Sequence, residues 1–253
     1  MEFITYEVAE KIARIVLRRP PLNVLNIAMM EEINSAIEDA TKRGEVCALC
    51  FFAEGEHFSA GVDVGEHMGD SAAKMIEVFD GMFRRLVEFS RPTVCAVQGN
   101  CLGGGCELAT FCDIVIASET AKFGQPEVRV GVFPPVAAAW WPLLPSSKRA
   151  VELLLTGEIV DAKSALEAGI INRVVPNAAL QEETEKTLKS LAKSSAAVLA
   201  HTKRAVSVPL QQVFLKSLQE IERLYLEELM RTHDAEEGLK AFLEKRKPQW
   251  RDG

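Results

Sequence analysis

Residues 98–113 read Q-G-N-C-L-G-G-G-C-E-L-A-T-F-C-D, and this stretch is the most informative in the chain. Three consecutive glycines, Gly103 to Gly105, let the backbone approach a ligand closely, because no side chain shields the peptide N–H groups. The apolar pattern that follows predicts a helix, whose first N–H groups are unpaired and carry partial positive charge. The stretch therefore predicts a site that can hold an oxyanion close to the carboxylate of Glu107.

Other glycine loops bind phosphate, and two of their signatures are missing here. The dinucleotide fingerprint G-x-G-x-x-G does not occur, since Gly105 is followed by Cys106 and Glu107, and no G-K-[ST] follows. Taken alone, the loop is also compatible with a tight strand-to-helix turn and a solvated glutamate. A second carboxylate, Glu127, ends the segment F-G-Q-P-E. An oxyanion loop with two carboxylates nearby indicates acid–base chemistry beside a carbonyl group.

A second turn of small residues lies earlier in the chain. Residues 56–67 read E-H-F-S-A-G-V-D-V-G-E-H. Together with L-G-G-G-C-E-L at 102–108 and F-G-Q-P-E at 123–127, this pattern resembles the crotonase (enoyl-CoA hydratase/isomerase) superfamily. The resemblance covers nearly the whole chain, from R-P-P-L-N-V-L at 19–25 to E-G-L-K-A-F-L-E-K-R-K at 237–247.

The hydrophobic pattern by itself predicts an α/β fold. Apolar runs at 12–18, 46–53, 93–97 and 112–117 have the length of strands and alternate with helical patterns. Such alternation is typical of β-α-β units and a mostly parallel sheet. From Ser146 onward the pattern becomes helical.

Several helix ends can be predicted from single residues. Asn26 is expected to cap a helix at its N-terminus. Gly157 and Gly169 are expected to end helices, because glycine adopts the left-handed conformation that helix C-termini favour. Asp234 and Glu237 have the spacing of a capping box for a last helix, with Asp in place of the usual Ser or Thr.

The resemblance implies a more specific architecture than the pattern does. Crotonase-like proteins form a spiral of β-β-α repeats, and their C-terminal helices pack in trimers that often pair into hexamers. We accordingly expect a spiral core at 1–195 and a helical C-terminal region at 196–253 that makes a homotrimer or hexamer. The apolar stripe from Leu210 to Tyr225 is suited to such packing.

Charge and hydropathy exclude several classes of partner. The net charge of −7 and the pI near 5.3 argue against nucleic acid or an anionic membrane surface. The N-terminus has neither a basic n-region nor an apolar h-region, and the apolar stretch 130–145 is interrupted by prolines. We therefore expect a cytoplasmic protein that binds neither nucleic acid nor membrane.

Six cysteines raise the question of metal or redox chemistry. Cys47 and Cys50 form a C-x-x-C pair, but they lie in a strand-like run that would send the two side chains to opposite faces. The chain has only four histidines and no second C-x-x-C. We expect reduced, structural thiols and no metal site.

The resemblance also implies roles for single residues. A thioester is activated when negative charge moves onto its carbonyl oxygen, which the protein must stabilise. In the crotonase pattern two backbone N–H groups do so, and here they are those of Val62 and Gly104. Glu107 and Glu127 match the two catalytic glutamates of the hydratase branch, which hold a water between them. Neighbouring carboxylates oppose each other's ionisation, so the pair supplies one acid and one base.

Further positions match the parts of the family that bind the substrate. The resemblance places Ala60 and Asp63 beside the coenzyme A portion, and Phe242 and Lys245 near its adenine or 3′-phosphate. Coenzyme A is then part of an acyl-CoA thioester substrate, and no separate cofactor is expected. His67 follows the first small-residue turn and is a candidate for the acyl pocket.

The chain departs from the hydratase pattern after Glu127. Many straight-chain hydratases carry a glycine-rich segment where this sequence has P-P-V-A-A at 134–138. Pro135 takes a position whose N–H can help to hold the water, and proline has no N–H. The shape of the acyl pocket and the placement of the water are therefore expected to differ.

The expected activity is hydration of an α,β-unsaturated acyl-CoA. The alternatives are an enoyl-CoA isomerase and a non-catalytic CoA-ester-binding protein of the same fold. Within the superfamily, residues 58–67 and the proline wall are similar to those of hydratases that act on cyclohexa-1,5-diene-1-carbonyl-CoA. A rigid wall suits a flat ring, because a preorganised pocket loses little entropy on binding. Val62 and Val136 are equally suited to a short linear acyl group, so both substrate classes stay open.

Overall fold

Strands and helices alternate along the chain, of which the computed structural model describes residues 1–69 and 71–253. The strands are β1 (Ile4–Ala9), β2 (Ile12–Leu17), β3 (Ala48–Ala53), β4 (Thr93–Val97), β5 (Asn100–Leu102), β6 (Ile114–Ser118), β7 (Lys122–Gly124), β8 (Ile159–Asp161) and β9 (Arg173–Val175). The helices are α1 (Ile27–Lys42), α2 (Ser71–Glu88), α3 (Gly104–Phe111), α4 (Pro135–Trp140), α5 (Ser147–Thr156), α6 (Ala162–Glu167), α7 (Leu180–Ala192), α8 (Ala196–Arg223) and α9 (His233–Leu243).

A mostly parallel sheet forms the centre of the molecule, as the sequence pattern predicts. Its strands lie in the order β1-β2-β3-β4-β6-β9. All neighbours from β2 to β9 are parallel, and only β1, which the pattern did not reveal, pairs antiparallel with β2. All of β4 and most of β3 are buried, which explains why their sequences are continuously apolar rather than alternating.

A smaller sheet, ordered β5-β7-β8 in the described chain, accounts for the β-β-α plan. β4 and β5 precede α3, while β6 and β7 precede α4, and in each pair the first strand joins the large sheet and the second the small one. After β3, the second strand is reduced to isolated bridges, one between Ser59 and Cys101 of β5 and one between Val62 and Leu25. These second strands are too short to produce a periodic pattern, which is why the repeat is invisible in the sequence.

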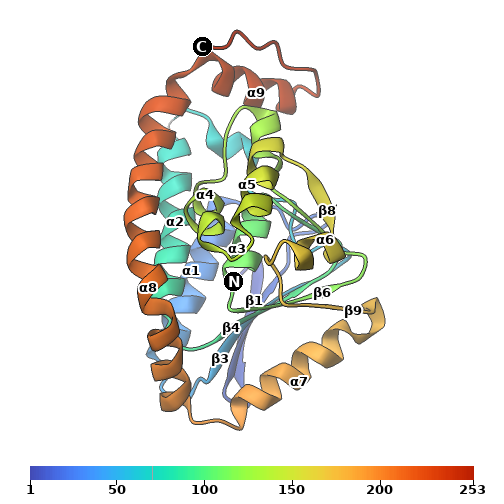
Figure 1. The fold of residues 1–253 in the computed structure, drawn as a ribbon, viewed down its shortest axis with the longest axis vertical. Helices are drawn as coiled ribbons and strands as arrows, with labels where there is room; N and C mark the ends of the chain where they lie inside the picture. The colour runs from blue at the N-terminus through green and yellow to red at the C-terminus, as the bar shows by residue number, and fades with distance from the viewer. Residues whose placement is uncertain (70) are drawn as a thin grey trace.

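Helices cover both faces of the large sheet. α1 and α2 pack against each other, and the long helix α8 runs beside α2 and α4 (Figure 1). On the opposite face α7 packs on β3, β4 and β6. α1 turns one apolar face inward, since Met30, Ile33 and Ile37 are fully buried.

The helix ends predicted at Asn26, Gly157 and Gly169 are also confirmed. The side chain of Asn26 accepts a hydrogen bond from the Met29 N–H at 3.0 Å and so caps α1. Gly157 ends α5 in the left-handed conformation, and Gly169 follows α6 with a φ of +72°.

The predicted capping box of the last helix is wrong. Thr232 caps α9, because its hydroxyl accepts a hydrogen bond from the Ala235 N–H at 3.1 Å. The Asp234 carboxylate instead accepts the N–H groups of Arg251 and Asp252 and so fastens the C-terminal tail. Asp234 thus stabilises the tail that follows α9 rather than the start of the helix.

The pattern predicted a helical chain beyond Ser146, and this prediction is wrong in part. The chain returns to the sheets twice. β8 pairs antiparallel with β7, and β9 adds a parallel edge strand next to β6. Each of these strands has only three residues, which is too few for a periodicity to be seen.

The apolar stripe on α8 is divided between core and solvent. Phe214 and Leu218 are fully buried, as is Tyr225 just beyond the helix, whereas Val213 and Leu224 are more than 40% exposed in the single chain.

All six cysteines are buried and unpaired, which confirms the expected structural thiols. Among the helices of the described residues, none has both the length and the apolar character needed to cross a bilayer.

Candidate active site

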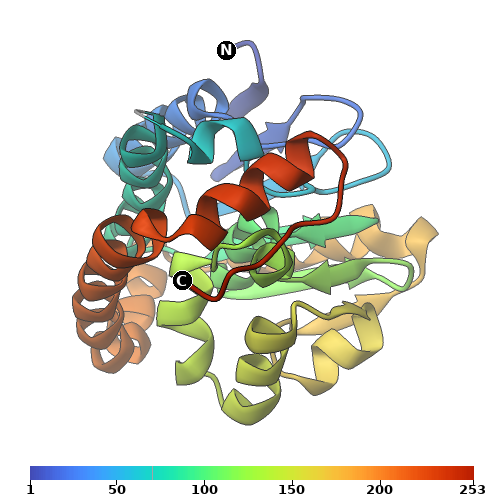
Figure 2. The same cartoon turned by 90° about the horizontal axis from the view of Figure 1, so that it is seen from above.

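A cavity of about 510 Å³ lies where the two small-residue turns meet α2 and the C-terminal helices. Its wall contains Val62 and Gly104, both glutamates of the predicted pair, Glu107 and Glu127, and Tyr225 from the segment after α8. α9 crosses over this part of the molecule (Figure 2), and its Leu239 closes one side of the cavity. The fold therefore brings together residues from turns about 45 positions apart in the chain and from its last helices.

The two turns approach each other as closely as their backbones allow. A Cβ atom on Gly105 would lie 2.5 Å from Ser59 Cβ, and one on Gly104 would lie 2.5 Å from Val62 Cγ2. Gly103 has a φ of +51°, a conformation that glycine adopts without strain. Gly104 is the first residue of α3, where N–H groups have no partner within the helix. Gly104 and Val62 thus line one cavity from adjoining turns.

Glu107 is held by the start of a second helix. Its side chain is 3% exposed, and its Oε1 accepts the Ala137 N–H at 2.7 Å. The N–H of Val136, in the first turn of α4, also lowers the pKa of this carboxyl, but burial raises it more, to about 7. The N-terminus of α4 therefore fixes Glu107 and favours its ionised form near neutral pH.

Glu127 lines the same cavity from the short helical turn Pro126–Val130. Its Oε1 would be 2.7 Å from a Cβ atom on Gly103, so it packs directly against the glycine turn. With the buried amide of Gln125 turned so that its hydrogen bonds are satisfied, its NH₂ group donates to this oxygen and to the Gly103 carbonyl oxygen, each at 3.2 Å. Gln125 thus ties the second carboxylate to the oxyanion turn.

The two carboxyls differ in what opposes their ionisation. The pKa of Glu127 is raised well above its usual value by burial and then by the negative charge of Glu107. Glu107 keeps two backbone donors from α4, whereas Glu127 has no donor from another segment's backbone. The pair titrates together, and the form favoured near neutral pH has Glu107 ionised and Glu127 protonated.

The two candidates for the acyl pocket line the same cavity. His67 ends the helical turn Val64–His67, and its Nδ1 lies 3.0 Å from the Asp63 carbonyl oxygen. Burial lowers the pKa of His67, so its ring is neutral at neutral pH. Pro135 is the first residue of α4, a position where proline is favourable because a missing N–H costs nothing there.

The structure does not bring all four candidate CoA contacts to the cavity. Ala60 lies in its wall, and Phe242 of α9, which is 53% exposed, lies at its edge. Asp63 caps the turn after it by accepting the Gly65 N–H at 3.1 Å, and it pairs with Arg19 at 3.6 Å. Lys245 is exposed beyond the end of α9 and is not part of the cavity wall.

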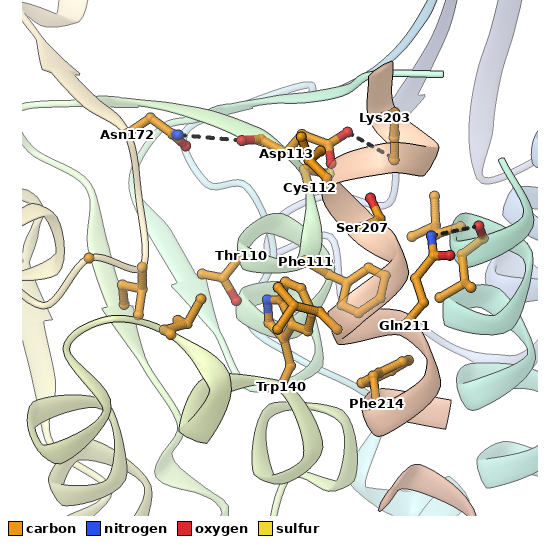
Figure 3. Close-up of a pocket in the computed structure, with 17 residues that line it drawn as sticks. Thr110, Phe111, Cys112, Asp113, Trp140, Asn172, Lys203, Ser207, Gln211 and Phe214 are labelled. Atoms are coloured by element: carbon orange, nitrogen blue, oxygen red, sulfur yellow. Dashed lines mark hydrogen bonds and ion pairs between the residues drawn. The ribbon is translucent and has the colours of Figure 1, made fainter. Parts of the chain in front are cut away.

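A second cavity, of about 360 Å³, lies between α8 and the end of α3 (Figure 3). The polar groups in Figure 3 largely satisfy one another: Lys203 pairs with Asp113 at 2.8 Å, and Asn172 donates to the Asp113 carbonyl oxygen. The aromatic side chains of Phe111 and Phe214 pack at 4.8 Å between ring centres. Because Asp113 and Lys203 are already paired with each other, the first cavity, with its two neighbouring glutamates, is the better candidate for the active site.

Three residues of the first site escaped the sequence analysis. Gln125 lies within the F-G-Q-P-E segment, and only its hydrogen bonds reveal that it supports Glu127. Arg129 is two residues beyond Glu127 and lines the cavity. Tyr225 was counted as one residue of an apolar stripe, and nothing local in the sequence shows that it faces the glutamates.

The close contact between the turns gives a test of the oxyanion site. Gly104→Ala would force its new Cβ against Val62 and Phe79, so the two candidate N–H donors must move apart. We expect turnover of an enoyl-CoA thioester, the substrate that the resemblance implies, to fall at least about a hundredfold, the scale of one oxyanion donor.

Gly44→Ala is the matched control, because a Cβ atom there meets nothing within 4 Å. Steady-state kinetics and thermal unfolding of both variants make the comparison. Wild-type turnover by a folded Gly104→Ala protein would remove Gly104 from the site.

Comparison of this chain with solved structures and with curated proteins identifies proteins of similar fold and sequence. An enoyl-CoA hydratase from Mycobacterium avium subsp. paratuberculosis superimposes with a TM-score of 0.89, at 27% identity and over 100% of both chains. A cyclohexa-1,5-dienecarbonyl-CoA hydratase from Thauera aromatica is 38% identical over 94% of this chain and 92% of its own length. A probable enoyl-CoA hydratase from Rhizobium meliloti is 35% identical over 99% of this chain and 98% of its own length.

The resemblance inferred from the sequence and the crotonase fold are both confirmed by these comparisons. The family model described as enoyl-CoA hydratase/isomerase matches residues 7–253. This match includes both small-residue turns, both glutamates and the C-terminal helices. The chain therefore belongs to the enoyl-CoA hydratase/isomerase family.

Proposed function

We propose that this protein adds water across the double bond of an α,β-unsaturated acyl-CoA thioester. The observation that carries the proposal is the meeting of Glu107 and Glu127 in one cavity with the turns of Val62 and Gly104. Acid–base groups beside backbone donors meet the two needs of thioester hydration, namely proton transfer and stabilisation of an enolate oxygen. Relatives named as hydratases across nearly the full length of the chain support the same reaction.

In the proposed reaction the N–H groups of Val62 and Gly104 bind the thioester oxygen. Glu107 takes a proton from water as the water oxygen forms a bond to the β-carbon. The electrons of the double bond move onto the thioester oxygen as an enolate, and they return when Glu127 gives its proton to the α-carbon. One water is consumed and the two carboxyls exchange protonation states, which solvent then restores.

The assignment of base and acid follows from the surroundings of the two carboxyls. Glu107 is the base because backbone N–H groups of α4 stabilise its anion. Glu127 is the acid because burial and the charge of Glu107 keep it protonated. The same arrangement makes Gln125 a positioning residue, since it fixes the orientation of Glu127 against the glycine turn.

We further propose that Ala60 and Phe242 contact the coenzyme A portion at the mouth of the cavity. Asp63 acts indirectly, because it caps the turn Val64–His67 that follows Ala60. Lys245 extends from the end of α9 in the solvent and is the candidate partner for the phosphates. His67 and Pro135 line the region that takes the acyl group.

Substitution of the glutamates tests the mechanism. Glu107→Gln and Glu127→Gln each remove one proton-transfer group while keeping the shape of the side chain. We expect each change to lower kcat at least about a hundredfold and to leave the binding of CoA esters largely intact. Hydration is followed by loss of the absorbance of the conjugated thioester and by the mass gain of one water.

The pH dependence of kcat/KM provides a second measurement on the same pair. Activity should fall as the pH drops through about 7, where Glu107 takes up a proton. It should fall again at high pH, where Glu127 loses its proton. Altered absorbance without a mass gain would establish an isomerase instead, and binding without any turnover a non-catalytic protein.

We propose a cyclic dienoyl thioester as the preferred acyl group. The acyl region is bounded by Phe79, Phe133 and the consecutive prolines Pro134 and Pro135. Such a wall has few rotatable bonds and therefore suits a flat, rigid ring. The relative from Thauera aromatica, named for a cyclic dienoyl-CoA, supports this choice.

Direct competition between substrates tests the acyl preference. The value of kcat/KM should be higher for cyclohexa-1,5-diene-1-carbonyl-CoA than for crotonyl-CoA, by about tenfold or more, because a preorganised wall favours the ring. A preference for crotonyl-CoA would rule out the cyclic substrate and leave the hydratase proposal standing.

We also propose that the helical region 196–253 assembles the protein into trimers or hexamers. The single chain exposes Val206, Val208, Val213 and Leu224 on α8 and directly after it. Apolar side chains at such positions are typical of a surface that is covered in an oligomer. Sedimentation at micromolar concentration should give three or six times the mass of one chain, and a monomer would contradict the proposal.

A further inference from the structure

Tyr225 is a buried polar residue to which the proposed reaction gives no task. It is 1% exposed and lines the same cavity as the two glutamates. Among residues 1–69 and 71–253, its hydroxyl has no hydrogen-bond partner. A buried hydroxyl without a partner is unfavourable, so it is expected to bond to something that occupies the cavity.

The backbone around Tyr225 departs from regular helix at this point. Residues Leu224–Glu228 form a π-helical turn at the end of α8. Such turns are rare and occur frequently at functional sites, because they redirect side chains that a regular helix would place elsewhere. The ring of Tyr225 packs edge-on against Phe133 with 5.2 Å between ring centres. Phe133 directly precedes the two prolines, so the tyrosine is held against the rigid wall of the acyl pocket.

The hydroxyl is surrounded by acidic groups. Burial and then the nearby carboxyl groups of Glu127, Glu107 and Asp80 raise the pKa of Tyr225 above its usual value. The phenol consequently stays protonated over the working pH range and can donate a hydrogen bond. An ionised carboxylate can only accept, so Tyr225 supplies the donor that ionised Glu107 lacks.

A donor is needed at this place because of Pro135. A water that gives its proton to Glu107 is positioned best when a further group donates to its oxygen. Pro135, at the start of α4, has no N–H with which to do so. From these contacts we propose that the Tyr225 hydroxyl donates a hydrogen bond to the oxygen of the reacting water. This inference rests on the proposed hydration and adds a residue to its machinery.

Kinetics of Tyr225→Phe provide the first test. The change should lower kcat about tenfold, as expected for loss of one neutral hydrogen bond, with KM changed less than about twofold. Tyr6→Phe is the matched control, because Tyr6 is the only other tyrosine and its hydroxyl donates to Asp39 outside the cavity. An unchanged kcat, or a raised KM with unchanged kcat, would overturn the proposal.

Binding of the product provides a readout that does not depend on turnover. The 3-hydroxyl of a 3-hydroxyacyl-CoA carries the oxygen that came from water, and the saturated acyl-CoA of the same length lacks it. Tyr225→Phe should weaken the first ligand about tenfold and leave the second unchanged. When tyrosine is ¹³C-labelled at Cζ, the NMR chemical shift of Tyr225 should change more on binding of the hydroxylated ligand than on binding of the saturated one.

These outcomes separate the role of Tyr225 from the proposed function. If both ligands change the Tyr225 signal equally, Tyr225 does not contact the added oxygen, even if hydration is established. If no enoyl-CoA is hydrated by the wild-type protein, the proposed function fails and the kinetic test with it. The response of the Tyr225 signal to the hydroxylated ligand then decides whether a hydroxyl group is still recognised there.

Discussion

The close approach of two turns is the constraint on which the rest of the site depends. Gly104 and Gly105 lie so near Val62 and Ser59 that a single added methyl group would collide with them. This contact brings two peptide segments to one cavity and fixes the start of α3, which carries Glu107. Glycine is required at these two positions because it lacks a side chain, whereas the positive φ of Gly103 needs the conformational freedom of glycine. The proposed oxyanion site therefore depends on packed backbone rather than on the placement of side chains.

Burial of acidic groups is the second feature that defines the site. Glu107 and Tyr225 are almost fully buried, and Asp80 behind them is fully buried. The pKa of Asp80 is raised well above its usual value by burial and by the adjacent Glu222 carboxyl, so it stays neutral. Among these carboxyls in the described residues, Glu107 is the one whose charge is stabilised by backbone donors from another segment. The negative charge is thus confined to Glu107, at the position where the proposed reaction needs a base.

The C-terminal helices complete a cavity that the spiral core leaves open. α8 ends in a π-helical turn that places Tyr225 at the wall, and α9 adds Leu239 and Phe242. The tail beyond α9 is fastened by the carboxylate of Asp234.

Much of the molecule follows from local sequence alone. Continuous apolar runs predicted the parallel strands, Asn26 predicted the start of α1, and the glycine turn with Glu107 indicated the chemistry, because each signal lies within a few adjacent residues. The three-residue strands could not be predicted, because they are too short to show a periodicity. The cap of α9 was predicted wrongly, because several polar residues lie close enough in sequence to reach its free N–H groups. The α4 donors of Glu107 and the place of Tyr225 were decided only by the tertiary structure. Both join segments far apart in the chain, and a contact of that kind leaves no trace in the local pattern of either segment.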